Sequence, residues 1–135
     1  MAGTPYVNTL RSPLGRARGL GSAKAGSAHW RAQRTTGLAL VPLTIWFIYS
    51  VIHLSDASRE AVMHWLSAPL PMVLMLALIV ATFHHLQLGL QVVIEDYVHE
   101  EGNKFFSILL INFLTVAGAA FALFAILKIA LGGAA

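Results

Sequence analysis

Residues 69–94 read PLPMVLMLALIVATFHHLQLGLQVVI and contain no Asp, Glu, Lys or Arg. A helix crosses about 30 Å of hydrocarbon with roughly 20 apolar residues, at 1.5 Å per residue, so this run is long enough to span a membrane. The span must be helical, because a lone strand would leave its backbone groups unpaired in lipid. Pro69 and Pro71 favour a helix start, where a missing N–H costs little. The run therefore predicts a transmembrane helix.

Apolar runs of similar length lie on both sides of it. The run before it reads GLALVPLTIWFIYSVIHL, with Pro42 expected in the first turns of its helix. The run after it extends from Phe105 to Leu131. The sequence thus predicts an all-α membrane protein whose three transmembrane helices cover about residues 37–54, 69–94 and 105–131.

The third run contains small residues around Gly118 that favour close helix packing, either with another chain or, as we prefer, within this one. Asn112 and Thr115 of the same run are expected to hydrogen-bond across helices.

The composition supports a membrane protein. The chain has 135 residues, of which 57% are hydrophobic and 11% are charged. A soluble domain carries about 25% charged residues, so this length and composition argue against a soluble enzyme. Cysteine is absent, which excludes disulfides, cysteine-ligated zinc or iron–sulfur sites and a cysteine nucleophile in this chain. Any redox role must use a cofactor held by other ligands.

The first 34 residues are rich in Gly, Ser, Ala and Arg, without an apolar period. We predict a basic, partly extended N-terminal segment over residues 1–36, with residues 1–27 mobile or lying on the surface, and a transmembrane domain over residues 37–131. A mitochondrial transit peptide is the alternative, because it has a similar composition. A nucleic-acid arm is disfavoured, because basic residues beside a span usually set its orientation.

The six basic residues before the first span place the N-terminus in the cytoplasm or matrix. The second span then returns to the same side, so residues 95–104, which read EDYVHEEGNK, also lie there. The C-terminus is expected on the outer side.

Polar side chains concentrate in the second span, where burying them in lipid is costly and therefore informative. From His85, steps of four, seven and eleven residues reach Gly89, Val92 and Asp96 on one helix face. His84 is rotated from that face by about 100°. A neutral imidazole at membrane depth suits an axial ligand of haem iron, and a flat ligand fits beside a glycine. A histidine that only hydrogen-bonds a neighbouring helix is the alternative interpretation.

The segment HHLQLGLQVVIEDYV over residues 84–98 resembles the helix-two signature of the small hydrophobic membrane anchor of succinate dehydrogenase (respiratory complex II). In that family a haem-ligating histidine is followed four residues later by glycine, and eleven and twelve residues later by Asp-Tyr. This chain has that spacing in His85, Gly89, Asp96 and Tyr97. The segment HWRAQRTTGLALVPLTIWF, which contains Arg34, resembles the entry to the first helix of the family. The resemblance covers about residues 29–131.

The resemblance implies roles for these residues. His85 would be one axial ligand of a haem b shared with a second three-helix anchor, with Gly89 beside the haem and Arg34 near a propionate. Tyr97 would donate a hydrogen bond to a ubiquinone carbonyl. Asp96 would orient an arginine of the second anchor or the proton path. FAD and iron–sulfur clusters would belong to a flavoprotein subunit and an iron–sulfur subunit, which Trp30, Arg31 and Arg34 are candidates to contact.

We therefore expect a membrane anchor of succinate:quinone oxidoreductase that has no catalytic activity alone and binds no nucleic acid. A bacterial cytoplasmic membrane, with the C-terminus in the periplasm, is preferred over the mitochondrial inner membrane. The alternative function is a small transporter or channel subunit whose ion or proton pathway is lined by His84, His85, Gln87 and Gln91. A structural anchor without haem is a third possibility. A cofactor role for His53 is disfavoured, and Trp46 and Trp65 are assigned to packing or the outer interface.

Overall fold

The structure is a computed structural model that describes residue 14 and residues 25–132. Its helices are α2 (Ala25–His53), α3 (Arg59–Ser67), α4 (Pro69–Tyr97) and α5 (Glu101–Gly132), and these described residues form no strand. α2, α4 and α5 are each long and apolar enough to cross a membrane. The prediction of an all-α membrane protein with three spans is confirmed.

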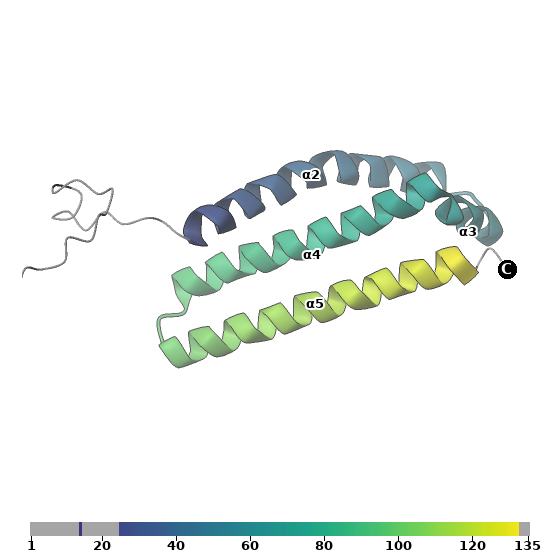
Figure 1. Cartoon of the computed structure of the whole chain (residues 1–135). Helices are drawn as coiled ribbons and strands as arrows, with labels where there is room; N and C mark the ends of the chain where they lie inside the picture. Colours follow the sequence, from purple (N-terminus) through teal and green to yellow (C-terminus); the bar gives the residue numbers. More distant parts are fainter. Residues whose placement is uncertain (1–13, 15–24, 133–135) are drawn as a thin grey trace, which may run out of the picture.

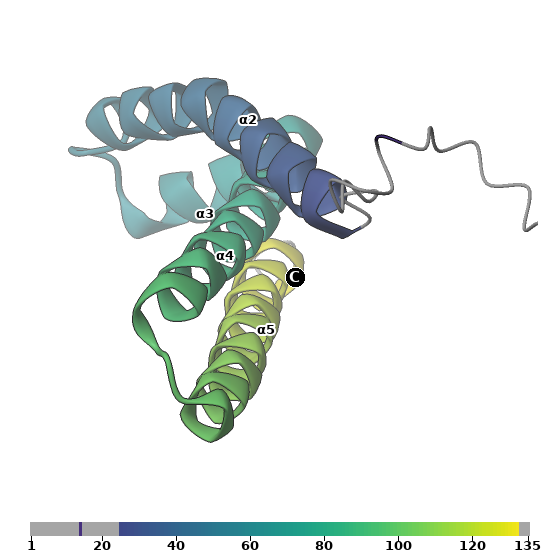
Figure 2. The ribbon, with the colours of Figure 1, turned by 90° about the vertical axis from the view of Figure 1, so that its left-hand side faces the viewer.

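The three long helices form an open layer with α4 in the middle (Figure 1). α4 contacts both α2 and α5, whereas α2 and α5 do not contact each other in the described part of the chain. Figure 2 shows α2 inclined to the other two helices. Only Leu66, Leu88 and Ala130 are buried hydrophobic residues among those described. Most apolar side chains therefore face outward, as expected for surfaces covered by lipid or by the helices of another chain.

The helix α2 begins earlier than predicted, at Ala25 rather than Gly37. Pro42 consequently lies inside the helix and not in its first turns, which corrects that prediction. Proline removes one backbone hydrogen bond and bends a helix, and α2 is visibly curved (Figure 1). Residues 1–13 and 15–24 lie outside the described residues, so the predicted extended, mobile segment stays a prediction there.

The short helix α3 was not predicted. Its N-cap is Ser58, whose side chain accepts a hydrogen bond from the Ala61 backbone N–H at 3.2 Å. Immediately after α3, Pro69 begins α4 as predicted. The Ser67 hydroxyl donates to the Ala130 carbonyl at 2.8 Å, which fastens the end of α3 to the last turns of α5.

The contact between α4 and α5 depends on a glycine. A Cβ added at Gly118 would lie 2.7 Å from Cε1 of Phe83, so only glycine lets the two helices approach this closely without a shift. Packing within the chain, the preferred interpretation of this segment, is confirmed. Gln87 Nε2 also donates to Asn112 Oδ1 at 2.9 Å, as expected for a bond across helices. The same expectation was wrong for Thr115, whose hydroxyl donates to the Ile111 carbonyl of its own helix at 2.7 Å.

Aromatic stacking joins the second half of α2 to the short helix α3. The ring centroids of Trp46 and Trp65 lie 5.9 Å apart with an interplanar angle of 18°. This stacking confirms their assignment to packing.

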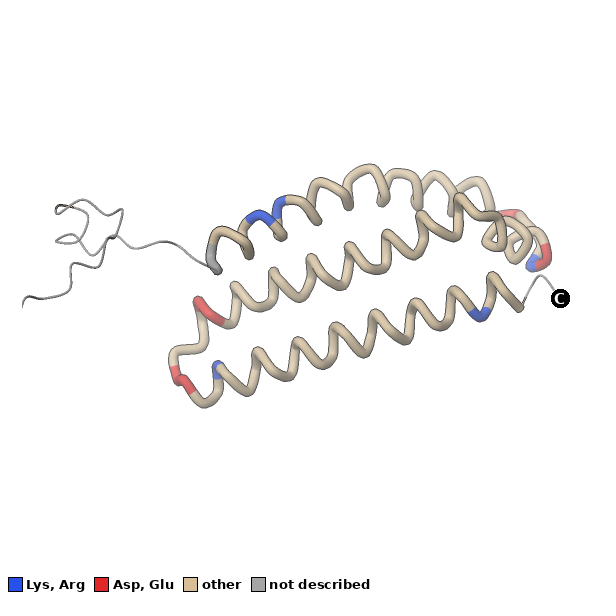
Figure 3. Tube along the Cα trace, in the orientation of Figure 1, with Lys and Arg blue, Asp and Glu red and all other residues tan. Residues whose placement is uncertain are grey.

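The charged residues are confined to the two ends of the helix layer (Figure 3). No Asp, Glu, Lys or Arg occurs between residues 35 and 55, 61 and 94, or 105 and 127. The start of α2 and the end of α4 lie at the same end of the molecule (Figure 1). This end therefore carries the basic residues of α2 beside the acidic residues of α4, as the alternation of three spans requires.

Candidate functional site

The imidazole of His85 faces α2 from the middle of α4. Its Nδ1 lies 3.0 Å from the Thr36 hydroxyl oxygen, within hydrogen-bond distance. A Cβ added at Gly37 would lie 3.2 Å from His85 Cε1 and 3.7 Å from Nδ1. The Nδ1–Cε1 edge of the ring is thus seated on α2, where glycine provides the space. His85 Nε2 has no hydrogen-bond partner among residues 25–132.

An open groove of about 700 Å³ runs between α2 and α4 beside this imidazole. Its volume lies within the range of about 300–1,000 Å³ that is usual for ligand pockets. Side chains of α2 form most of its lining, which consists of Trp30, Gln33, Arg34, Gly37, Leu38, Val41 and His85. The Arg34 guanidinium carbon lies 5.5 Å from the centre of the Trp30 ring, a cation–π arrangement between two residues of the groove wall. The groove therefore combines an imidazole, a cation and apolar walls.

Two polar atoms near this groove are buried without a partner. They are Gln33 Oε1 and His29 Nε2, on residues four apart on one face of α2. Gly89 packs against the same glutamine, because a Cβ added there would lie 3.6 Å from Gln33 Nε2, an ordinary contact distance. Buried polar atoms in proteins normally have partners, so these two atoms retain unused hydrogen-bonding capacity.

His84 lies in a different environment from His85. It lines a smaller open groove of about 350 Å³ between α4 and α5. Most of this lining is apolar, and its members are Val80, Phe83, His84, Gln87, Thr115, Val116, Ala119, Ala120 and Leu123. The predicted rotation between the two histidines is confirmed.

This separation also bears on the alternative function, a channel or transporter subunit. His85 lines the α2–α4 groove, while His84 and Gln87 line the α4–α5 groove. Gln91 instead donates to Glu95 Oε1 at 2.7 Å. The four residues do not surround a common cavity in the described chain, so a shared ion pathway is not favoured.

Asp96 and Tyr97 are the last two residues of α4. Both are exposed, Tyr97 at 78% of its surface. Among the described residues, neither side chain has a hydrogen-bond partner, although the Tyr97 carbonyl lies 3.1 Å from His99 Nδ1. They lie at the same end of the molecule as the start of α2 (Figure 1). This end therefore presents a phenol and a carboxylate that are available to a ligand or to another chain.

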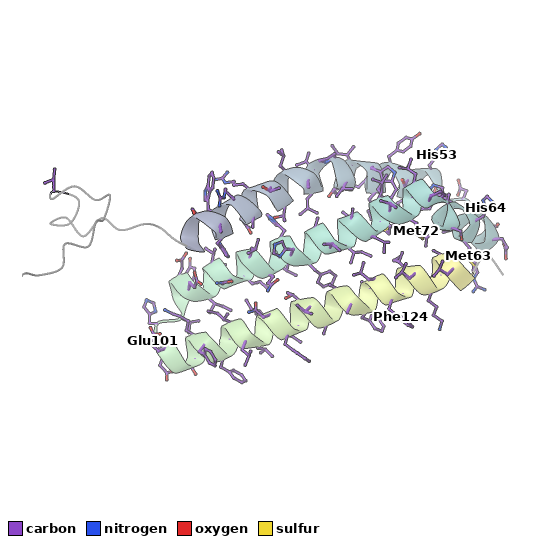
Figure 4. All side chains as sticks on the ribbon, viewed as in Figure 1. His53, Met63, His64, Met72, Glu101 and Phe124 are labelled. Carbon is purple, nitrogen blue, oxygen red and sulfur yellow. The ribbon has the colours of Figure 1, made fainter. Side chains whose placement is uncertain are left out.

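His53 and His64 lie away from this site. Figure 4 shows His53 and His64 at the end of the molecule opposite Glu101. The His53 ring stacks on Tyr49, with centroids 5.5 Å apart. Residues 25–132 contain no group of three or more His, Asp or Glu side chains that could hold a metal ion.

Three residues of this site were not predicted from the sequence: Gln33, Thr36 and Gly37. They follow His29 by four, seven and eight residues, which is the spacing of one helix face. Gln33 and Thr36, however, fall within residues 1–36, which were predicted as a basic, partly extended segment, so they were not assigned to a helix face. Because α2 begins at Ala25 in the structure, Gln33, Thr36 and Gly37 lie on one face of the same helix.

Known proteins similar to this chain come from one family. A sequence model of the family described as succinate dehydrogenase/fumarate reductase transmembrane subunit matches residues 8–119. The succinate dehydrogenase hydrophobic membrane anchor subunit of Rickettsia conorii is 37% identical over 93 residues, which cover 68% of this chain and 74% of that protein. The anchor subunit of the same name from Rickettsia bellii is 34% identical over 89 residues, covering 66% and 71%.

The succinate dehydrogenase hydrophobic membrane anchor subunit of Paracoccus denitrificans is 28% identical over 115 residues, covering 83% of this chain and 88% of that protein. No solved structure matches the chain. The family model matches far more than half of the sequence, and its description agrees with the three helices that are long and apolar enough to cross a membrane. The chain therefore belongs to the succinate dehydrogenase/fumarate reductase transmembrane subunit family.

Proposed function

We propose that this chain, as a membrane anchor subunit of a succinate dehydrogenase complex, provides one axial ligand to a haem b and part of a ubiquinone site. The observation that carries the proposal is the setting of His85. Its Nδ1 is hydrogen-bonded to α2, its Nε2 has no partner in the described chain, and the ring lines an open groove. A histidine that only joined two helices would not need this groove. When bound, a haem supplies one-electron transfer within the membrane.

The residues around His85 fit such a group. Arg34 lines the same groove and provides a positive charge for a propionate. Gln33 lines the same groove, and its amide oxygen has no hydrogen-bond partner in the described chain, so it keeps its capacity to accept one. Gly89, one turn from His85, adds no side chain to the α4 surface, and the Gln33 amide of the groove wall lies against it. Haem thus fits this donor set, with His85 as the axial ligand.

Asp96 and Tyr97 are proposed to serve the quinone. Reduction of a quinone requires two electrons and two protons, so proton donors must stand where water reaches the membrane edge. Carboxylates are disfavoured in the last turn of a helix by the helix dipole, and that turn contains no basic residue. The stability of α4 therefore does not explain why an aspartate occupies position 96 in its last turn. We infer that Tyr97 donates its phenolic hydrogen bond to a quinone carbonyl, while Asp96 orients a partner arginine or the proton path.

The open helix layer supports a complex with other chains. The faces of α2 and α5 carry large exposed apolar side chains, and α2 and α5 do not cover each other in the described part of the chain. A second three-helix anchor would cover part of this surface and supply the other haem ligand. The exposed Trp30, Arg31 and Arg34 would contact the iron–sulfur subunit, which carries the clusters beside an FAD-containing flavoprotein. The anchor itself would have no catalytic activity alone.

The basic residues before the first span support a location and an orientation. Six basic residues precede the first apolar span, which favours a cytoplasmic N-terminus in a bacterial cytoplasmic membrane, with the C-terminus in the periplasm. Asp96 and Tyr97 would then lie on the cytoplasmic side, where the catalytic subunits dock. The mitochondrial inner membrane is the second choice.

The purified complex tests the haem proposal. We expect its reduced-minus-oxidised absorption spectrum to contain a b-type haem band in stoichiometric amount with this anchor. A complex that retains all its subunits but contains no haem would contradict the proposal and would favour a purely structural anchor.

The Tyr97→Phe variant tests the quinone proposal. It removes only the phenolic hydroxyl, so succinate:quinone turnover should fall by about tenfold, the effect of losing one hydrogen bond of about 1.4 kcal/mol. Reduction of an artificial acceptor by the soluble subunits should remain unchanged. Tyr49→Phe is the matched control, because this tyrosine is also exposed but stacks on His53. Equal losses in both assays would refute the role of Tyr97.

A further inference from the structure

We propose that Thr36 is a positioning residue for His85, which it holds in the tautomer that leaves the Nε2 lone pair available to a metal. The inference rests on the proposed function of His85 as a haem ligand. It goes further by naming the group on another helix that sets the protonation pattern and the orientation of that ligand.

The first step follows the single proton of the Thr36 hydroxyl. The shortest contact of Oγ1 is with the Ala32 carbonyl of its own helix at 2.8 Å, and the Gln33 carbonyl lies at 3.2 Å. Threonine inside a helix commonly donates to the carbonyl four residues before it. A carbonyl can only accept, so this bond uses the hydroxyl proton. Oγ1 is then left as an acceptor.

The second step follows the proton of the imidazole. Because Oγ1 acts as an acceptor, the bond of 3.0 Å to His85 Nδ1 requires that Nδ1 carries the hydrogen. A neutral imidazole has one N–H, so Nε2 keeps its lone pair. Donation from Nδ1 to an oxygen also makes the opposite nitrogen more basic and therefore a stronger metal ligand. Without Thr36, the Nδ1–H would be an unpaired donor within a membrane span, which is unfavourable.

The third step concerns the orientation of the ring. Turning the imidazole over would replace Nδ1 by a carbon at the position facing Thr36 and lose the hydrogen bond. The neighbouring Gly37 leaves just enough room for the Nδ1–Cε1 edge, because a Cβ there would lie 3.2 Å from Cε1. Thr36 and Gly37 together therefore form a socket that accepts one edge of the imidazole in one orientation.

The experiment uses the whole complex in its native membrane with three variants of this anchor. Thr36→Val keeps the shape of the side chain but removes the hydroxyl, and Thr36→Ser keeps the hydroxyl but removes the methyl group. Thr35→Val is the matched control, since Thr35 precedes Thr36 on the same helix and is exposed. The measurements are the haem content per complex, the haem midpoint potential and the electron paramagnetic resonance spectrum of the oxidised haem.

We expect Thr36→Val to shift the midpoint potential to a more positive value and to change the g values of the oxidised haem, because a less basic imidazole stabilises ferric iron less. Thr36→Ser and Thr35→Val should match the wild type. Loss of haem from Thr36→Val, with haem retained in Thr36→Ser, would also support the inference. If Thr36→Val fails to assemble, Thr36→Ala replaces it in the same comparison.

Two results would overturn the inference while leaving His85 as the ligand. One is a Thr36→Val complex with the wild-type haem content, potential and spectrum. The other is an equal change in Thr36→Val and Thr36→Ser, which would assign the effect to packing at this position and not to the hydroxyl. A wild-type complex without haem would instead refute the proposed function, and this inference with it.

Discussion

The two grooves on either side of α4 contain adjacent histidines in very different surroundings. His85, in the α2–α4 groove, meets a hydroxyl, a glycine and an arginine-lined wall. His84, in the α4–α5 groove, lies among side chains that are mostly apolar. The α2–α4 groove has about twice the volume of the other, at about 700 Å³ against 350 Å³.

The difference shows that the neighbouring helix, rather than the residue type, determines the surroundings of a histidine in a membrane span. Within α4 the two imidazoles are chemically equivalent, and one step along the helix turns them about 100° apart. Only α2 offers a partner for Nδ1 together with space for the ring edge. The α4–α5 contact instead serves packing, through Gly118 and the bond between Gln87 and Asn112.

Filling the socket on α2 should have the largest effect. In Gly37→Val, the added side chain must displace the His85 ring, because even a Cβ would lie 3.2 Å from Cε1. Haem content per complex should fall by about tenfold or more, as is usual when the support of a metal ligand is lost. Ala39→Val, at an exposed position of the same helix, is the control and should retain its haem. Full haem content in Gly37→Val would disprove the socket.

Filling the contact on the other side of α4 should reduce stability more than cofactor binding. Gly118→Val would clash with the Phe83 ring, since a Cβ alone would lie 2.7 Å from Cε1. The cost expected for such overpacking is about 1–3 kcal/mol, visible as a lower thermal unfolding midpoint of the complex in detergent. Adding Phe83→Ala should recover part of this loss, because the two sites are in contact. A wild-type midpoint in Gly118→Val would show that the helices are not packed this closely.

The smallest effect is expected from the polar pair between α4 and α5. Gln87→Leu removes the donor of the 2.9 Å bond to Asn112, and interhelical bonds of this kind contribute about 0.6 kcal/mol in membranes. Asn112→Leu should cost a similar amount, and the double variant should cost less than the sum. Haem content and quinone turnover should not change. If Gln87→Leu abolished quinone turnover, the α4–α5 groove would have a functional role and not only a packing role.

The arrangement along single helices was largely predictable from the sequence. Apolar length alone identified the three spans, because the hydrocarbon thickness sets a minimum that few soluble segments reach. The spacing of His85, Gly89 and Asp96 identified one face of α4, since helical geometry fixes which residues align. Asp96 and Tyr97 were expected at the same end as the start of α2, because a chain that crosses the membrane twice returns to its starting side.

The parts that depend on two helices were less accessible. Thr36 and Gly37 meet His85 only because α2 is rotated and shifted to one register against α4, and no local pattern specifies that register. The start of α2 was misjudged for a different reason. Its first turns contain Arg, Gln and Thr rather than an apolar run, so the apolar length that identified the spans gave no signal there, although polar residues recur at the spacing of one helix face. The back-bonding of Thr115 likewise could not be distinguished from a bond across helices.

The most direct test of the account compares His85→Ala with His84→Ala in the assembled complex. The two variants remove the same side chain from adjacent positions of one helix, so general effects on membrane insertion are matched. We predict that the b-type haem band of the reduced-minus-oxidised spectrum is lost in His85→Ala and kept in His84→Ala. A band that survives His85→Ala, or that disappears only in His84→Ala, would contradict the assignment of the α2–α4 groove as the haem site.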